Sequence, residues 1–173
     1  MTACTIELSK TEDIDTIFSI YKMATEIQRE KKMHVWMGFE RSLIEQEIKE
    51  ERHWKVLMNN QIAGVFCLNF SPEDIWRNYP HDSVFYIHRL AKDSDLKFSI
   101  LSEIINWAKS FARSKNLRCL RLDTFSDNKE LIAYYVRSGF DLKGVIKVNS
   151  DPNLPLHYQN ASLALLEMNL VNG

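Results

Sequence analysis

The sequence predicts a mixed α/β fold, with a central mixed sheet whose middle strands run parallel. Three observations lead to this fold class. Strand-like runs alternate with amphipathic helical segments along the chain. The dipeptide Asn59-Asn60 alone separates two strand-like runs, which predicts an antiparallel hairpin. A later strand–helix–strand run predicts a parallel pair, because such a crossover is right-handed and lays its helix across one face of the sheet.

The first half of the chain should form a strand, two helices and the hairpin. Apolar and polar residues alternate over 4–10, as in a half-buried strand. Segment 11–28 has apolar residues at helical spacing behind an acidic first turn, which indicates a helix. A second amphipathic segment, 39–51, precedes the hairpin, which spans 53–70.

The second half continues the alternation of strands and helices. The expected elements are a strand at 83–91, a helix at 97–115, a strand at 117–125, a helix at 128–138, and strands at 140–148 and 163–170. Gly139 should end the shorter helix as a left-handed cap. Segment 150–162 contains two prolines and several turn-forming residues, so we expect an exposed loop.

Composition limits the class of protein. The chain has 173 residues, of which 45% are hydrophobic, enough for a sizeable core, and we expect a single domain over 1–173. A net charge of −1 gives no electrostatic reason to expect a nucleic acid or an anionic membrane as partner. No long apolar run and no secretory signal pattern is visible, so we expect a cytoplasmic protein.

The cysteines and histidines indicate neither disulfides nor a metal site. Cys4, Cys67 and Cys119 each lie in an apolar strand-like run and form no CxxC motif, which is typical of small buried side chains. No histidine pair falls at i and i+4 with an acidic partner, so we expect no metal.

Three stretches of the chain are distinctive: YIHRLAKD at 86–93, LRLDTFSDN at 120–128 with the preceding Arg118, and YYVRSGF at 134–140. In these stretches, and in the order of elements over nearly its whole length, the chain resembles the GNAT superfamily of N-acetyltransferases. The resemblance implies the acyl-CoA N-acyltransferase fold, with splayed parallel middle strands and helices on both faces. It also implies acetyl transfer from acetyl-CoA to a primary amine of a small molecule or peptide, and allows a homodimer.

Acetyl transfer requires a neutral amine, a stabilised oxyanion and an acid for the departing thiolate. Asn128 and Tyr135 are seven residues apart, so they should lie on one helix face. By resemblance Tyr135 would be the acid, and Asn128 would contact the pantetheine or help place the helix. The alternative is that Tyr134 and Tyr135 are ordinary packing residues.

His88 is the candidate for the second catalytic group. Strand alternation places Tyr86, His88 and Leu90 on one face, and it places Phe85, Ile87 and Arg89 on the other. On the cleft face His88 would have a pKa near the working pH, suited to accepting a proton from the amine. The alternative is a core histidine bonded to a backbone carbonyl.

Other charged residues near His88 have weaker claims. Arg89 and the Arg121/Asp123 pair would be compatible with a structural ion-pair set. Weaker alternatives for the base are Glu73, Asp74 and Asp82.

The segment before the long helix departs from the superfamily pattern. That pattern has Arg or Gln, then Gly, then Gly or Ala, where this chain has Leu96, Ser99 and Leu101. Backbone N–H groups and the helix dipole bind a pyrophosphate even without glycine. The expected coenzyme contacts are Leu90, Ala91, Lys97, Phe98, Ser99, Ile100, Leu101 and Asn128.

Side chains of this segment have opposing effects. The Ser99 hydroxyl and the Lys97 ammonium should favour a phosphate, whereas the bulk of Leu101 and the charge of Asp95 should oppose it. We therefore expect a weakened or reshaped site.

The acceptor should bind over the first helices and the 150–162 loop. The expected lining residues are Trp36, Phe39, His157 and Tyr158, although core packing is the alternative for each. Two other functions stay open: a coenzyme A- or ligand-binding module without turnover, and an interaction module that binds no coenzyme.

Overall fold

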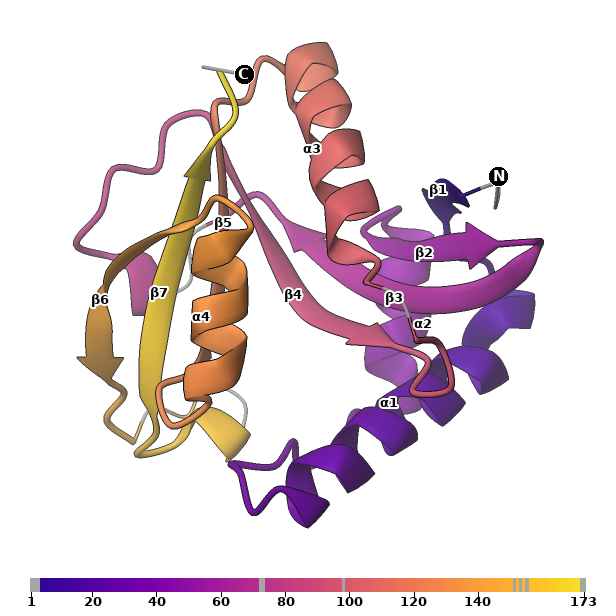
Figure 1. Cartoon of the computed structure of the whole chain (residues 1–173), viewed down its shortest axis with the longest axis horizontal. Coiled ribbons are helices and arrows are strands. Elements are labelled where there is room, and N and C mark those ends of the chain that lie inside the picture. Colours follow the sequence, from indigo (N-terminus) through magenta and orange to yellow (C-terminus); the bar gives the residue numbers. More distant parts are fainter. Residues whose placement is uncertain are drawn as a thin grey trace.

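The computed structural model describes residues 4–71, 74–97, 99–150, 152, 154 and 156–171 (Figure 1). Its strands are β1 Cys4–Leu8, β2 His53–Met58, β3 Gln61–Asn69, β4 Val84–Lys92, β5 Cys119–Phe125, β6 Asp141–Lys147 and β7 Ser162–Asn169. Its helices are α1 Ile14–Glu30, α2 Arg41–Lys49, α3 Leu101–Lys115 and α4 Lys129–Arg137. Short 3-10 turns are η1 Thr11–Asp13, η2 Asp74–Trp76 and η3 Leu156–Tyr158.

The described strands form one mixed sheet in the order β1-β2-β3-β4-β5-β7-β6. Neighbouring strands are antiparallel except β4 and β5, which run parallel. This central pair is bonded only between Val84–Tyr86 and Cys119–Arg121. Beyond these residues the two strands diverge (Figure 1). The predicted mixed sheet with parallel, splayed middle strands is confirmed.

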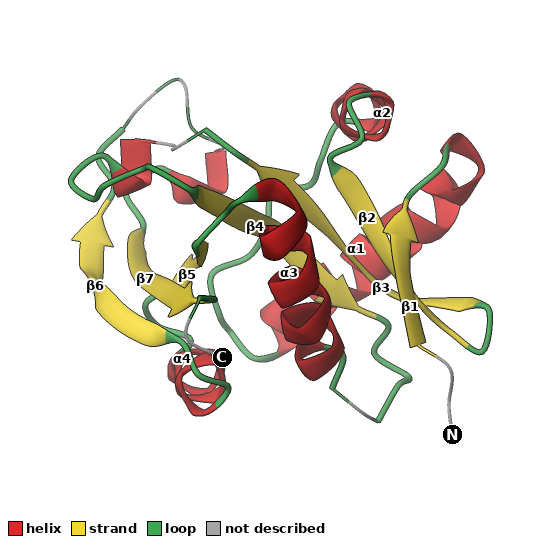
Figure 2. Cartoon of the chain, turned by 90° about the horizontal axis from the view of Figure 1, so that it is seen from above, coloured by secondary structure: helices red, strands yellow, loops and turns green. Residues whose placement is uncertain are grey.

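Helices cover both faces of the sheet, because each has an apolar stripe that it must bury. On one face α3 packs with Ile104 and Ala108 against Phe85 and Leu120. On the opposite face Ile17 of α1 and residues of α2 pack against β3 and β4. Figure 2 shows α2 and α4 on opposite sides of the sheet.

Two turn predictions are confirmed. Asn59 and Asn60 have φ of 50° and 63° between β2 and β3, the left-handed values that a two-residue hairpin turn requires and that asparagine tolerates. Gly139 has φ of 101° directly after Ser138, the C-cap of α4, and the Phe140 N–H donates to the Tyr135 carbonyl at 3.1 Å.

The start of the long helix was predicted four residues too early. Asp93 begins a turn instead: its carboxylate accepts the Asp95 N–H at 3.0 Å and its carbonyl accepts the Leu96 N–H at 3.3 Å. Aspartate competes for backbone N–H groups in this way and delays a helix. α3 therefore begins at Leu101, behind a longer connection from β4.

A bulge interrupts β4 and corrects the predicted alternation. Arg89 has φ of 51°, and the register with β3 shifts between Val65 and Cys67. An extra residue in one strand reorients the side chains that follow it. Leu90 consequently packs on the α3 side with Ile87, not with His88, and Arg89 points to the α2 side.

Among the described residues, no helix is long and apolar enough to cross a membrane. Cys4, Cys67 and Cys119 are free thiols.

The space around Gly64 of β3 leaves no room for a side chain. A Cβ there would lie 2.3 Å from Ile100 Cδ1 and 2.8 Å from the Ala91 carbonyl oxygen of the neighbouring strand. The methyl end can move, but the sheet backbone cannot. We expect Gly64→Ala to destabilise the fold by about 1–3 kcal/mol, the range for overpacking, measured by urea unfolding.

Ile100→Val supplies the control, because it deletes the Cδ1 atom. In that background Gly64→Ala should cost less than in the parent, yet still destabilise through the Ala91 carbonyl. Unchanged stability of Gly64→Ala in the parent would contradict the steric argument.

Candidate active site

A cavity of about 140 Å³ lies where β4 and β5 diverge. Its walls come from α1, the segment after α1, both central strands, α4 and η3. Tyr135 and Asn128 line it from α4 and its cap, and His88 lines it from β4. The fold thus brings together three residues that the sequence singled out.

A second cavity of about 540 Å³ lies next to the first and is lined by the segment after α1, α2, β3, β4 and η3. Both cavities share His88, Arg89, His157 and Tyr158. Of the predicted acceptor contacts, Phe39, His157 and Tyr158 line the second cavity, and Trp36 lines the first. His88 and Arg89 therefore lie at the boundary between the first, smaller cavity and the second, larger one.

Tyr135 is buried on α4, with 7% of its surface exposed. Its ring packs at 5.6 Å from that of Phe140. Burial, and to a lesser extent the neighbouring Tyr134 and Asp123, raises the pKa of the Tyr135 hydroxyl. The phenol is therefore protonated at neutral pH and can act as a proton donor in the cavity.

His88 lies on the same face as Tyr86, as predicted, with the two rings stacked at 6.4 Å. Burial, followed by the charges of Arg89 and Arg52, lowers the pKa of His88 to about 4. The expectation of a pKa near the working pH is therefore wrong. His88 is neutral at pH 7, and it can accept a hydrogen bond but binds a proton weakly.

Asp123 of β5 is a residue that sequence reasoning placed in an ion-pair set. The structure separates that set: Arg121 donates to Glu167 at 2.7 Å, whereas Asp123 Oδ2 accepts the Tyr158 hydroxyl at 2.9 Å. Asp123 lines the first cavity. Burial raises the pKa of Asp123 to about 6, against the lowering effect of the Tyr158 hydrogen bond.

Asn128 is the N-cap of α4. Its Oδ1 accepts the Leu131 N–H at 3.2 Å, satisfying one of the donors that a helix start leaves unpaired. Of the two roles that the sequence left open, placing the helix is the one that this bond performs, and Asn128 also lines the first cavity.

Arg89 forms an ion pair with Glu47 of α2, and its guanidinium lies 5.1 Å from the centre of the Phe39 ring. The Arg89 and Glu47 side chains are 15% and 4% exposed. The ion-pair role predicted for Arg89 is confirmed with a partner that the sequence did not indicate. The bulge at Arg89 makes this contact, because it turns the side chain toward α2.

The family is decided by a direct match. The model of the acetyltransferase (GNAT) family matches residues 16–140, more than half of the chain. The chain belongs to this family.

Known relatives agree with that membership. N-acetyltransferase YesJ of Bacillus subtilis (strain 168), described as uncharacterized, is 24% identical over 142 residues, covering 77% of this chain and 79% of that protein. A GNAT-family acetyltransferase from Listeria monocytogenes 4b F2365 has the same fold, with a TM-score of 0.73 at 19% identity over 96% of this chain and 94% of that one.

The ribosomal-protein-S18-alanine N-acetyltransferase from Escherichia coli is also similar in fold. Its TM-score is 0.66 at 13% identity, over 97% of this chain and 94% of that one. Identities this low show the shared fold alone.

The GNAT family generally uses acetyl-CoA, and two features of this chain fit that coenzyme. After Tyr86 and Arg121 the facing edges of β4 and β5 no longer pair across the gap, so an extended amide-containing arm can enter between them. Ile100, the N-cap of α3, lies against Gly64, which pairs with Lys92 at the end of β4, so the dipole of α3 would favour a phosphate near that end.

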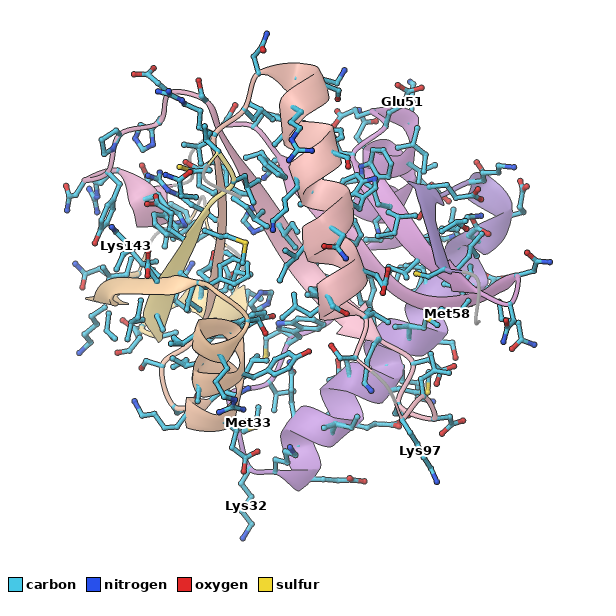
Figure 3. All side chains as sticks on the ribbon, turned by 45° about the horizontal axis from the view of Figure 1, so that its top comes forward. Lys32, Met33, Glu51, Met58, Lys97 and Lys143 are labelled. Carbon is cyan, nitrogen blue, oxygen red and sulfur yellow. The ribbon has the colours of Figure 1, made fainter. Side chains whose placement is uncertain are left out.

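The segment before α3 is hydrogen-bonded to α4. Ser99 Oγ accepts the Leu101 N–H at 3.1 Å and forms a short hydrogen bond with the Tyr134 hydroxyl of α4. The Ile100 and Leu101 side chains are buried in the core, so only their backbone can face a ligand. Lys97 is exposed and extends away from the ribbon (Figure 3).

The remaining predicted residues divide into three groups. Leu90 packs on the α3 side and also lines the first cavity, whereas Ala91 is buried on the α1 side. Asp74 and Asp82 line neither cavity. Phe98 and Glu73 lie outside the described residues. Within the described part of the chain, no three His, Cys, Asp or Glu side chains gather as a metal ion would require.

Proposed function

We propose that this GNAT-family protein transfers the acetyl group of acetyl-CoA to a primary amine of a small molecule or peptide in the cytoplasm. The observation that carries the proposal is the splay of β4 and β5. It places Tyr135 and His88 around one cavity, directly beside a larger cavity that can receive the acceptor.

Residues on the two sides of the splay have different tasks. Tyr135, protonated because its pKa is raised, donates its proton to the sulfur as the C–S bond breaks. His88, neutral because its pKa is lowered, accepts a hydrogen bond from the incoming amine and orients its lone pair. Phe39, His157 and Tyr158 shape the acceptor space.

A coenzyme A- or ligand-binding module with weak or no turnover is the second candidate. It is favoured by the glycine-free segment before α3 and by the Ser99–Tyr134 hydrogen bond, which joins this segment to α4. Calorimetry with acetyl-CoA, together with continuous measurement of thiol release over a panel of amines, separates the two functions. Binding with amine-dependent release supports the enzyme, and binding without release supports the module.

Ser99 tests where the pyrophosphate binds. Ser99→Asp places a negative charge at the start of α3, so it should weaken acetyl-CoA binding at least tenfold, or about 1.4 kcal/mol. Calorimetry measures the change, and Ser110→Asp, on the exposed face of α3, is the matched control. Equal affinities for Ser99→Asp and the parent would remove this segment from the site.

A further inference from the structure

The two carboxylate oxygens of Asp123 differ: one accepts a hydrogen bond, and the described residues leave the other unsatisfied. Oδ2 accepts the Tyr158 hydroxyl at 2.9 Å, whereas Oδ1 is buried and has no hydrogen-bond partner among the described residues. A buried carboxylate oxygen without a partner is costly, so such an atom calls for a ligand or a function. Asp123 lines the cavity between β4 and β5, where an amine would meet the thioester.

Strand alternation places Asp123 opposite to the proposed acid. Leu120 and Leu122 of β5 belong to the core under α3 and α4, together with Tyr135. Phe125 belongs to the core on the other face, and Asp123 pairs in register with Leu165 of that same core. Tyr135 and Asp123 therefore enter the splay from opposite faces of the sheet.

We propose that Asp123 is the general base of the acetyl transfer, and that Tyr158 positions its carboxylate with Oδ1 toward the acceptor nitrogen. This inference rests on the proposed function and assigns to Asp123 the proton transfer that the sequence suggested for His88. Tyr158 suits its positioning role because it lines both cavities, and so joins the acceptor space to the base.

The electrostatic surroundings agree with this assignment. Titratable or charged side chains around the cavity are His88, Arg89, Tyr135, His157 and Tyr158, with His34 stacked on Phe125. From α1, Ala24 and Gln28 contribute no charge. Burial raises the pKa of Asp123 to about 6 and lowers the pKa of His88 to about 4. At pH 7 Asp123 is ionised and is the stronger proton acceptor of the two.

The proton balance of the step is complete. The amine nitrogen forms a C–N bond with the thioester carbon and gives a proton to the Asp123 carboxylate. The C–S bond breaks, and the departing sulfur takes the proton of the Tyr135 hydroxyl. Asp123 then holds one proton too many and Tyr135 one too few, so exchange with solvent restores both. The net products are an N-acetyl amine and the free thiol.

The first test is Asp123→Asn, which preserves shape and removes the base. In the parent, kcat/KM should fall as the pH falls through about 6, because Asp123 must be ionised. This fall is the acid limb of the pH profile. Asp123→Asn should lower kcat roughly 10²-fold or more and abolish the acid limb, while the affinity for acetyl-CoA stays within a few-fold of the parent. His88→Gln should keep the acid limb.

The second test is Tyr158→Phe, which removes the hydrogen bond that holds the pKa of Asp123 down. The acid limb should then move to a pH above that of the parent. A merely structural contact would lower activity without moving the limb. This variant keeps the proposal testable if Asp123→Asn fails to fold, which circular dichroism would show.

The outcomes separate this inference from the function on which it rests. If the parent acetylates an amine and Asp123→Asn retains its turnover or its acid limb, the base assignment is overturned and the acetyltransferase stands. An unmoved limb in Tyr158→Phe overturns the positioning role. If the parent binds acetyl-CoA but acetylates no amine of the panel, the proposed function fails first and the base assignment with it.

Discussion

Tyr135→Phe should lower turnover by roughly 10²-fold while acetyl-CoA affinity stays within a few-fold of the parent, the effect expected for losing one general acid. The ring is retained, so its packing on Phe140 and within the core under α3 and α4 is preserved. The hydroxyl stabilises the developing thiolate, which exists only in the transition state, so its loss acts on kcat rather than on binding. Paired measurements of acetyl transfer and coenzyme binding at saturating amine give both numbers.

Tyr134→Phe is the matched control on the adjacent residue. Its hydroxyl is hydrogen-bonded to Ser99, and Tyr134 does not line the first cavity with His88. Turnover should change far less than in Tyr135→Phe. Full turnover of Tyr135→Phe, or greater damage from Tyr134→Phe, would leave α4 with a packing role alone.

The sequence predicts the elements of this fold well because their signals are local. Apolar stripes at helical spacing, the Asn59-Asn60 turn and the cap at Gly139 are each readable within a few residues. The order of strands and helices then limits the topology, because crossovers are right-handed. The splay of β4 and β5 was predicted only through the family resemblance, because no local sequence pattern indicates where two parallel strands stop pairing.

Parts of the site escaped sequence reasoning because they depend on distant partners. Arg89 adopts a positive φ, which no propensity predicts for arginine. The strand residues that follow Arg89 therefore lie on the face opposite to the one that regular alternation predicts. Burial raises the pKa of Asp123, and its carboxylate accepts a hydrogen bond from Tyr158, 35 residues later in the chain. A pKa is a property of the surroundings, so neither the value for Asp123 nor that for His88 can be read from the residue itself.

Glu47 shows how a helical pattern can indicate a buried charge. It follows Ile44 by three residues, so it lies on the same buried face of α2, with 3% of its surface exposed. A carboxylate in such a position requires a partner, and the bulge in β4 supplies Arg89.

We expect Glu47→Gln to destabilise the fold by about 3–5 kcal/mol, because it leaves the buried Arg89 guanidinium without its counter-charge. Urea unfolding at neutral pH measures the change. The control is Asp15→Asn, which breaks the pair with Arg41 at 3.1 Å; those side chains are 91% and 58% exposed, so the loss should stay below about 1 kcal/mol.

The double variant Glu47→Gln/Arg89→Met separates the ion pair from other effects of the substitution. Removing both charges leaves no uncompensated ion in the interior, so the double variant should be more stable than Glu47→Gln alone, despite losing the contact of Arg89 with Phe39. If the two substitutions were instead additive, Glu47 and Arg89 would not act as a pair. A parent-like unfolding midpoint for Glu47→Gln would contradict this argument, because it would show that solvent already screens the Arg89 guanidinium.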